Sequence, residues 1–431
     1  MNLRRQKQHK ESPQTITLSG PASPRTGVVV THPIQYFSPL WRELSHHLNT
    51  RVLYLRKCEA DYAGLHDTGF GRQVSWDVDL LGGYKWSSAG LKQIPFKVTS
   101  TDLLKILHST RKWIRAENID VVLIPGWTMP YLAVRVACQL EHRAVIMRPE
   151  ARAGLVSWRS IFRDLLLKRI VRGVSSFAVI GTDAKRELTR LGVEPHRLFN
   201  SLYTIDDQLW KKMLDEKVAD RSAIRERLGY KDFHVVFFYS GKLQGYKRVS
   251  LLIQALALVC RSRPEARLLV AGTGPDEAAL RAEARSLGVE ESVNFVGFMN
   301  QTELPAMYVA ADAYVLASFE TWGLVVNEAA IAGLPLIVAS TAGAAVDLVS
   351  PGLNGWRVSP LVEQIAAAMD EAMDPELRRR YANNSSLIAE QFNIRSAAAG
   401  IAKAAEHAAC LAISGSATDA FEASSTLDSK S

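Results

Sequence analysis

Two glutamates in the second half of the chain have a spacing that suits ligand binding. Glu320 lies in a predicted loop after an apolar run, residues 313–317, that has the pattern of a buried parallel strand. Glu328 follows eight residues later, in the opening turns of a predicted helix. Gly323 between them permits close backbone approach at the helix N-terminus, where free N–H groups and the helix dipole attract phosphate. The pattern suits a ligand with hydroxyl groups at both ends and a pyrophosphate in the middle, such as a nucleotide sugar. The alternative interpretation is an ordinary strand–loop–helix unit, with Glu320 as a first-turn charge and Glu328 on a solvated face.

A group of cations follows another predicted strand, residues 235–240. Gly241 and Gly245 bracket a loop with Lys242, Lys247 and Arg248. A cation aimed at a pyrophosphate stabilises the charge that develops as the sugar bond breaks, so it favours the transition state over the ground state. Three cations alone are more typical of a solvated loop. Their place on the first strand of the domain that also carries the glutamates favours the anion site.

Several segments of this half together resemble the donor-binding region of family-4 glycosyltransferases with the GT-B fold. They are residues 311–318, the glutamate pair, Gly-Leu-Pro at 333–335 and Gly-Leu-Asn-Gly at 352–355. The resemblance covers roughly residues 27–410. It implies an α/β fold of two Rossmann-like, doubly wound domains that face a cleft, with a C-terminal crossover helix. It also implies retaining transfer of a sugar from a nucleoside diphosphate sugar, of the UDP or GDP type, to an acceptor hydroxyl on a polysaccharide or lipid-linked glycan. Neither a metal nor another cofactor is expected.

The resemblance assigns roles to residues of the second domain. Glu328 matches the ligand of the ribose hydroxyls, since a carboxylate can accept two vicinal O–H bonds. Glu320 matches the residue beside the donor sugar. Lys242 and Lys247 match the phosphate-binding Arg and Lys, although lysine at 242 loses bidentate geometry. The predicted catalytic residues are therefore Glu320, Lys247 and Lys242. The predicted donor-binding residues are Gly241, Lys242, Lys247, Gly272, Phe298, Glu320, Trp322, Gly323, Leu324 and Glu328.

The first domain is expected to hold the acceptor. His32 and Gln35 follow the first predicted strand, where the family usually has a glycine-containing loop. His32 is a ligand, a general base or a packed histidine. Trp127 stands where many relatives carry a functional histidine, and tryptophan cannot transfer that proton. Arg148 and Glu150 resemble an Arg–Glu element of a bacterial branch of the family, or they form an ion pair within the domain.

A further segment of the first domain resembles the same bacterial branch. It comprises residues 67–71 together with Trp76 and Asp77. We expect an ordered loop over the acceptor side.

Short β-rich runs alternate with helical patterns in two series. Such βα alternation indicates parallel sheets with ligands at the C-terminal ends of the strands. We predict an N-terminal acceptor domain over residues 26–203, a donor domain over 204–393 and a crossover helix over 394–412. Residues 1–25 and 413–431 are predicted disordered tails. The predicted strands are 27–31, 51–55, 121–124, 144–147 and 176–180, and then 235–240, 267–271, 293–296, 313–317 and 336–339.

Composition limits the class of protein. A chain of 431 residues favours two domains, and 47% hydrophobic with 22% charged residues is typical of soluble globular proteins. The chain lacks an apolar run of about eighteen residues and an apolar signal segment, so we expect neither a membrane span nor secretion. Four scattered cysteines indicate free thiols in a reducing cytoplasm. A net charge of +8 indicates an anionic partner. Nucleic acid is the weakest candidate, because no nucleic-acid-binding motif stands out.

The stretch 152–172 combines basic residues with Leu155, Ile161, Phe162, Leu165, Leu166 and Ile170. It suits the anionic inner face of a cytoplasmic membrane beside a lipid-linked acceptor. A solvated helix that packs its apolar face on the core has the same pattern. Two other functions also fit the sequence: a sugar-nucleotide epimerase with the GT-B fold, and a non-catalytic sugar-nucleotide-binding protein.

Overall fold

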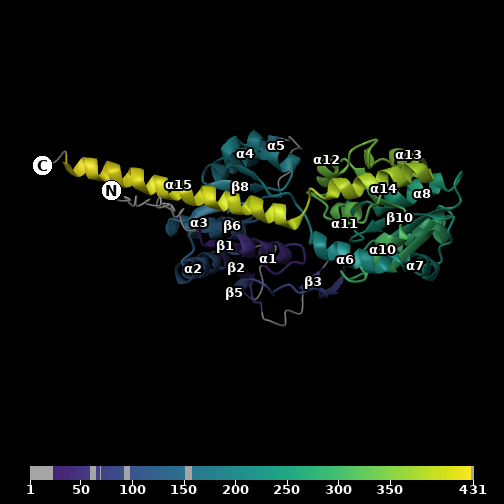
Figure 1. Cartoon of the computed structure of the whole chain (residues 1–431), viewed down its shortest axis with the longest axis horizontal. Helices are drawn as coiled ribbons and strands as arrows, with labels where there is room; N and C mark the ends of the chain where they lie inside the picture. Colours follow the sequence, from purple (N-terminus) through teal and green to yellow (C-terminus); the bar gives the residue numbers. More distant parts are fainter. Residues whose placement is uncertain (1–22, 59–64, 68, 92–97, 151–157, 429–431) are drawn as a thin grey trace, which may run out of the picture.

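Two parallel sheets form the cores of two domains that lie side by side (Figure 1). The computed structural model describes residues 23–58, 65–67, 69–91, 98–150 and 158–428. The N-terminal sheet has the strand order β5-β2-β1-β6-β7-β8-β9. Its central strand β1 pairs in parallel with β2 and β6, with Val28 opposite Val52 and Leu123. The strands are β1 (Thr26–Val30), β2 (Thr50–Arg56), β5 (Lys85–Leu91), β6 (Val121–Ile124), β7 (Ala144–Met147), β8 (Ser176–Val179) and β9 (Leu198–Asn200).

Both faces of this sheet are apolar, because alternate residues of a strand point to opposite sides and helices cover both. Val28 belongs to the apolar cluster under α1 (Ser38–His47) and α15 (Ile394–Asp428), whereas Val29 belongs to the cluster under the other helices. Those helices are α2 (Ser100–Ala116), α3 (Met129–Leu140), α4 (Trp158–Arg172) and α5 (Thr182–Arg190). The sheet is therefore a buried layer, and its polar chemistry is confined to its edges and strand ends.

Helix α15 crosses back from the C-terminal domain and runs along the N-terminal domain (Figure 1). Its buried face is rich in alanine, which lets the helix approach the strands closely. A Cβ at Gly400 would lie 1.8 Å from the carbonyl oxygen of Asn200, and the Ser176 hydroxyl donates to the carbonyl of Ala404 at 2.7 Å. The small residues of α15 thus allow direct backbone contact with the edge of the sheet.

The structure differs from the predicted C-terminal tail. The prediction ends the last helix at residue 412, whereas α15 continues to Asp428. Residues 413–428 contain no proline, and adding residues to an existing helix needs no new nucleation. The predicted disorder over 413–431 is therefore wrong as far as Asp428. Residues 429–431, and residues 1–22 of the predicted N-terminal tail, lie outside the described part of the chain.

The C-terminal domain is built on a second parallel sheet of order β12-β11-β10-β13-β14-β15. Its strands are β10 (Val235–Ser240), β11 (Ala266–Ala271), β12 (Val293–Gly297), β13 (Ala313–Leu316), β14 (Leu336–Ala339) and β15 (Gly355–Val358). Helices α8 (Val249–Val259), α9 (Glu277–Ser286) and α13 (Val362–Glu371) pack together. A second group comprises α6 (Asp207–Val218), α7 (Arg221–Arg227), α10 (Leu304–Ala310) and α11 (Val325–Ile331), and α11 also contacts α14 (Pro375–Ala389). Short elements are α12 (Ala344–Leu348), η1 (Pro195–Arg197), η2 (Gly245–Lys247) and η3 (Glu290–Ser292).

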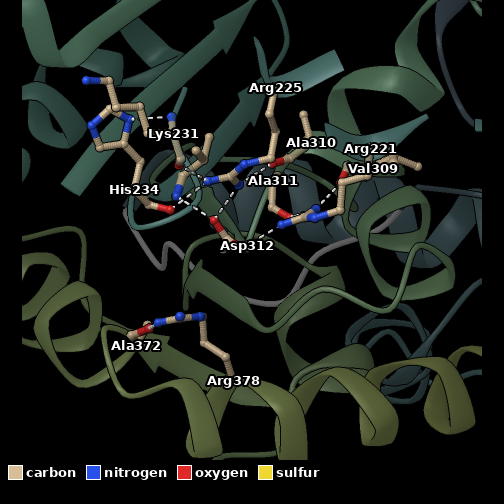
Figure 2. A network of polar contacts seen from close by, with 11 residues as sticks. Arg221, Arg225, Lys231, His234, Val309, Ala310, Ala311, Asp312, Ala372 and Arg378 are labelled. Carbon is tan, nitrogen blue, oxygen red and sulfur yellow. Dashed lines mark hydrogen bonds and ion pairs between the residues drawn. The ribbon is translucent and has the colours of Figure 1, made fainter. Parts of the chain in front are cut away.

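An arginine network around Asp312 joins α7 to the starts of β10 and β13 (Figure 2). Asp312 accepts hydrogen bonds from Arg221 at 2.8 Å, from Arg225 at 3.0 Å and from the amide of Val236 at 2.8 Å. Arg225 is only 4% exposed, and a buried guanidinium needs acceptors for its donors. It also donates to the carbonyls of Ala310, Lys231 and His234. The network lies at the N-terminal ends of β10 and β13 and holds α7 against this edge of the sheet.

The basic helix α4 divides its apolar residues between two faces. Leu167 and Ile170 are buried, whereas Leu165 and Leu166 are 60% and 57% exposed. Lys168 and Arg169, next to them, are also exposed. Leu165, Leu166 and Ile170 therefore do not share one apolar face, and the two leucines lie on a basic outer surface. Arg152 and Leu155 lie outside the described residues, as do the side chains of residues 158–162.

The predicted α/β class, with two Rossmann-like doubly wound domains, is confirmed. Strands β5, β9 and β15 were not predicted, nor was the antiparallel hairpin of β3 (Leu65–Asp67) and β4 (Arg72–Val74). Serine-, glycine- and asparagine-containing edge strands lack the apolar runs that mark the buried central ones. Among the described residues, no helix has both the length and the apolarity needed to cross a membrane.

Candidate active site

A cavity of about 950 Å³ lies where the C-terminal strand ends of the two sheets face each other. In the N-terminal domain its walls come from the loops after β1 and β7 and from residues of the segment 69–76 around β4. In the C-terminal domain they come from the loops after β10, β11, β12 and β13. In both sheets the strand order reverses beside the first strand of the domain, β1 or β10. Such switch points leave a crevice for ligands between diverging loops. All ten predicted donor-binding residues line this cavity.

Two hydrogen bonds hold the loop after β10 in place. The Tyr239 hydroxyl donates to the carbonyl of Lys242 at 2.9 Å, and the amide of Gly241 donates to the carbonyl of Ala271 at 2.9 Å. Gly272 has φ +139°, and a Cβ there would lie only 1.8 Å from the carbonyl oxygen of Gly241. Only glycine therefore lets the loops after β10 and β11 touch backbone to backbone. This contact places Lys242 at the cavity wall.

Lys247 and Glu320 form an ion pair across the cavity wall. Each side chain is 16% exposed, and the Ser318 hydroxyl also donates to Oε1 of Glu320 at 2.9 Å. The backbone holds Glu320 in place: its amide donates to the carbonyl of Thr341 and its carbonyl accepts from the amide of Gly343, both at 3.2 Å. Glu320 and Lys247, two of the predicted catalytic residues, are thus direct neighbours.

Gly323 forms the turn that leads from Glu320 into α11. Its φ of +102° lies in a region that only glycine adopts readily. In the described part of the chain, the amides of Gly323 and Leu324 have no hydrogen-bond acceptor, as expected for the first N–H groups of a helix. The Trp322 ring is buried, and its Nε1 donates to Oδ1 of Asn327 at 2.8 Å. The turn presents backbone donors to the cavity, whereas the indole anchors it.

Glu328 is fully buried and already satisfied by two tyrosines. Its Oε1 accepts from the Tyr36 hydroxyl at 2.9 Å and its Oε2 from the Tyr308 hydroxyl at 2.8 Å. Burial raises the pKa of Glu328 to about 7, although both hydrogen bonds act in the opposite direction. Tyr36 belongs to the N-terminal domain and Tyr308 to α10 of the C-terminal domain. A ligand hydroxyl at this carboxylate would therefore meet tyrosines from both domains.

The structure brings His32, Gln35 and Glu150 of the predicted acceptor set to the cavity. Glu150 contacts both domains: the Tyr203 hydroxyl donates to Oε1 at 2.5 Å and the Thr321 hydroxyl to Oε2 at 2.8 Å. The Glu150 carboxylate therefore contacts Thr321, the residue that directly follows Glu320.

Arg148 and Trp127 are absent from the residues that line this cavity. Arg148 is buried, donates to the hydroxyl and carbonyl of Ser201, both at 3.2 Å, and stacks its guanidinium 4.8 Å from the centre of the Tyr203 ring. In the described structure it makes no ion pair with Glu150, so the alternative of an Arg148–Glu150 pair is wrong. A buried guanidinium needs hydrogen-bond acceptors, and the hydroxyl and carbonyl of Ser201 supply them here.

We predicted that the segment with Trp76 and Asp77 covers the acceptor side. In the structure it does more than that. It reaches across to the loops of the C-terminal domain: the amide of Thr302 donates to Oδ2 of Asp77 at 3.2 Å, and Asn300 donates to the carbonyl of Ser75 at 3.0 Å. The hairpin β3–β4 projects the segment beyond its own sheet, and a local pattern does not reveal this.

Asp77 and Asp79 have Asp-x-Asp spacing, and two such carboxylates could share a divalent cation if both faced the same point. Their carboxylates serve different partners here. Asp77 accepts from Thr302, whereas Asp79 accepts from the amides of Leu81 and Gly82 at 3.0 and 2.8 Å. The hydrogen bonds from the amides of Gly82 and Leu81 hold the pKa of the Asp79 carboxyl below its usual value. Asp77 and Asp79 are therefore close in the sequence but have different hydrogen-bond partners.

Sequence reasoning missed the tyrosines and Thr321 as site residues. Tyr36, Tyr203 and Thr321 line the cavity, and Tyr308 reaches Glu328 from behind. Tyr36 directly follows the predicted acceptor residue Gln35 in the sequence. Tyr308 gave no signal, because a tyrosine in a buried helix is usually a core residue.

Residues 220–387 match the model of the family described as glycosyl transferases group 1. The chain is also 34% identical to a glycogen synthase of Mycobacterium tuberculosis over 314 residues, which are 72% of this chain and 69% of that protein. The chain belongs to the group 1 glycosyl transferases. The matched region contains the glycine loops, Lys242 and Lys247, and the cavity residues Glu320 and Glu328. The family resemblance stated from the sequence is thereby confirmed.

Other group 1 relatives match over shorter stretches. The chain is 30% identical to a GDP-mannose-dependent monoacylated alpha-(1-6)-phosphatidylinositol monomannoside mannosyltransferase of Corynebacterium glutamicum, over 39% of this chain and 46% of that protein. It therefore spans less than half of that relative's length. Among solved structures, HepE of Anabaena, in complex with UDP and glucose, superposes with a TM-score of 0.66 at 17% identity, covering 88% of this chain and 98% of HepE. This likeness shows a shared fold.

Proposed function

We propose that this protein transfers a sugar from a nucleoside diphosphate sugar to an acceptor hydroxyl, with retention of anomeric configuration. One observation carries the proposal: Lys242, Lys247, Glu320 and Glu328 converge, with the Gly323 turn, on one interdomain cavity. Its volume of about 950 Å³ is at the upper end of ordinary ligand pockets. The cavity has room for both a nucleotide sugar and an acceptor hydroxyl.

The donor would lie along the C-terminal domain. Its pyrophosphate would meet the amides of Gly323 and Leu324 and the ammonium groups of Lys242 and Lys247, because helix N-termini and cations both favour phosphate. Its ribose would reach Glu328, whose carboxylate can accept two hydroxyl hydrogens. Its sugar would then lie beside Glu320 and face the N-terminal domain. The base would occupy the end near Phe298.

The chemical step breaks the bond from the anomeric carbon to the phosphate oxygen and forms a bond from that carbon to the acceptor oxygen. The acceptor proton passes to the departing phosphate, on the same face of the sugar. Lys247, now paired with Glu320, would turn to the phosphate as negative charge grows there. Lys242 and Lys247 would supply the positive charge that a divalent metal supplies elsewhere. Glu320, released from Lys247, would accept from a sugar hydroxyl and stabilise the electron-poor ring.

The names of relatives support this donor class. HepE is described in complex with UDP and glucose, and the Corynebacterium glutamicum relative is described as GDP-mannose-dependent. We therefore infer a UDP- or GDP-sugar donor. The acceptor is a glycan or a lipid-linked glycan intermediate, and the exposed Leu165 and Leu166 beside Lys168 and Arg169 suit contact with an anionic membrane.

A donor screen with a product assay tests the proposal. Purified protein is mixed with UDP-, GDP- and ADP-sugars, and binding is followed by thermal shift. The donor that binds is then incubated with candidate glycan acceptors, and products are resolved by mass spectrometry and NMR. We expect a glycoside with the donor's anomeric configuration. Interconversion of the free donor sugar would indicate an epimerase. Binding without transfer or hydrolysis would indicate a non-catalytic binding protein, and an inverted product would contradict retention.

A further inference from the structure

Residues 69–77 of the N-terminal domain dock onto the C-terminal domain at the rim of the cavity. Three loop residues after β11 and β12 receive them: Thr273 donates to the carbonyl of Phe70 at 3.1 Å, Asn300 to the carbonyl of Ser75 at 3.0 Å, and Thr302 to the carboxylate of Asp77 through both amide and hydroxyl. Two of these acceptors are backbone carbonyls. The docking therefore fixes the path of the segment as well as single side chains.

The docked segment completes an aromatic wall. Phe70 packs edge-on against Phe298, with ring centres 5.1 Å apart and planes at 85°, and Trp76 lies 6.2 Å from the same ring at 45°. All three rings line the cavity. Phe298 belongs to the C-terminal domain, whereas Phe70 and Trp76 are contributed from the other domain. Rings that already pack against one another are held in place, and they offer an apolar surface at little further entropic cost.

This wall is next to the phosphate-binding lysine loop. The Lys242 ammonium lies 5.0 Å from the centre of the Phe70 ring, within the range of a cation–π contact. Gly241 and Gly272, which also line the cavity, place the loops after β10 and β11 in backbone contact. A ligand with phosphates at Lys242 would have its adjoining nucleoside within reach of Phe70, Trp76 and Phe298.

We propose that Phe70 and Trp76 bind the nucleobase of the donor, and that Asp77 positions them. The inference rests on the proposed nucleoside diphosphate donor and assigns part of its recognition to the domain that holds the acceptor. Base–aromatic contacts tolerate different bases, because every base has a π-face. The wall therefore supplies affinity for the nucleoside, and the site is complete only when segment 69–77 is docked.

The test separates nucleoside binding from phosphate binding. Calorimetry compares the nucleoside diphosphate that binds the parent protein best with inorganic pyrophosphate, for the parent and for Phe70→Ala, Phe70→Leu and Trp76→Ala. Phe70→Leu keeps the apolar bulk and removes the ring. The matched control is Phe233→Ala, because Phe233 is 64% exposed and precedes β10 at the opposite end of the sheet.

We expect Phe70→Ala and Trp76→Ala each to weaken nucleoside diphosphate binding about tenfold, and Phe70→Leu to weaken it as well. Pyrophosphate binding should stay at the parent's value, and Phe233→Ala should match the parent with both ligands. Equal nucleotide affinity in parent, Phe70→Ala and Trp76→Ala would overturn the inference and leave the proposed function standing. A parent that binds no nucleoside diphosphate would overturn both. An equal loss of pyrophosphate and nucleotide affinity would also overturn the base assignment.

Asp77 provides a second test, because it touches Thr302 and is absent from the residues that line the cavity. Asp77→Ala should weaken nucleotide binding severalfold and leave pyrophosphate binding unchanged. Asp77→Asn keeps an oxygen that can accept from both Thr302 donors, so it should restore the parent's affinity. An Asp77→Ala variant that binds nucleotide like the parent would overturn the positioning role, as would an Asp77→Asn variant that fails to restore binding.

Discussion

The hydroxyl of Tyr36 donates a 2.9 Å hydrogen bond to Oε1 of Glu328, and the two residues come from different domains. Glu328 is fully buried, and a buried carboxylate needs donors. Tyr36 and Tyr308 supply them in the structure. Under the proposed function, a ribose hydroxyl takes a place at the same carboxylate. Nucleotide binding and the contact between the domains therefore involve the same oxygen atoms.

Replacement of Glu328 by alanine tests its role as the ribose ligand. Glu328→Ala removes the acceptor of two hydroxyl hydrogens, and hydrogen bonds to a charged group are worth about 2 kcal/mol, so nucleoside diphosphate affinity should fall about 30-fold. Isothermal calorimetry measures the change. Pyrophosphate lacks ribose and serves as the control ligand, with unchanged affinity expected. Unaltered nucleotide affinity would count against the assignment.

The raised pKa of Glu328 makes a prediction about stability and pH. Its folded-state pKa of about 7 exceeds the ordinary value of 4.5, so between these values the folded state binds more protons than the unfolded state. Stability from this group is therefore lost as pH rises from about 4.5 to about 7, by about 3 kcal/mol at most. Glu328→Gln cannot ionise. Its urea midpoint relative to the parent should be higher at pH 8 than at pH 5, and an identical difference at both pH values would refute the prediction.

Lys247 should act mainly on turnover. If its ammonium stabilises the departing phosphate, Lys247→Ala should lower kcat about 100-fold and change KM much less. Steady-state kinetics with the identified donor measures both. Lys211→Ala, which removes an exposed cation on α6, serves as the control for net charge and should behave like the parent. A Lys247→Ala variant with the parent's kcat would defeat the leaving-group role.

Transfer should not need a divalent metal, because Lys242 and Lys247 occupy the cavity wall where phosphate charge must be neutralised. We expect the same initial rate in EDTA and in added Mg²⁺ or Mn²⁺. A rate lost in EDTA and restored by either metal would contradict this prediction. The Asp77→Asn variant, which keeps an acceptor for Thr302 and removes the charge, would then show whether this carboxylate binds the metal.

Leu165 and Leu166 provide the test of membrane contact. Replacing both by glutamine should reduce binding to phosphatidylglycerol vesicles about tenfold, because the apolar area available for insertion is lost while the basic residues remain. Co-sedimentation measures binding, and phosphatidylcholine vesicles serve as the uncharged control. Parent protein that stays in the supernatant with both vesicle types would contradict the membrane proposal.

The sequence by itself was sufficient for the α/β class and for grouping the residues that line the C-terminal side of the cavity. Gly241 and Gly272 directly follow β10 and β11, and Gly323 and Glu328 lie in the loop and helix that follow β13. Such spacing is local, because a strand, its loop and the next helix place these residues with little help from elsewhere. Edge strand β9 and the extension of α15 escaped prediction, since neither has a pattern of its own.

Only the tertiary structure decided which residues of the N-terminal domain contact the C-terminal domain around the cavity. Tyr36 bonds to Glu328, Glu150 receives Thr321, and residues 69–77 dock on the loops after β11 and β12, whereas Arg148 turns inward to Ser201. Each contact joins residues far apart in the chain. Its geometry depends on how the two sheets are placed relative to each other, and the periodicity of a strand or helix carries no information about that placement.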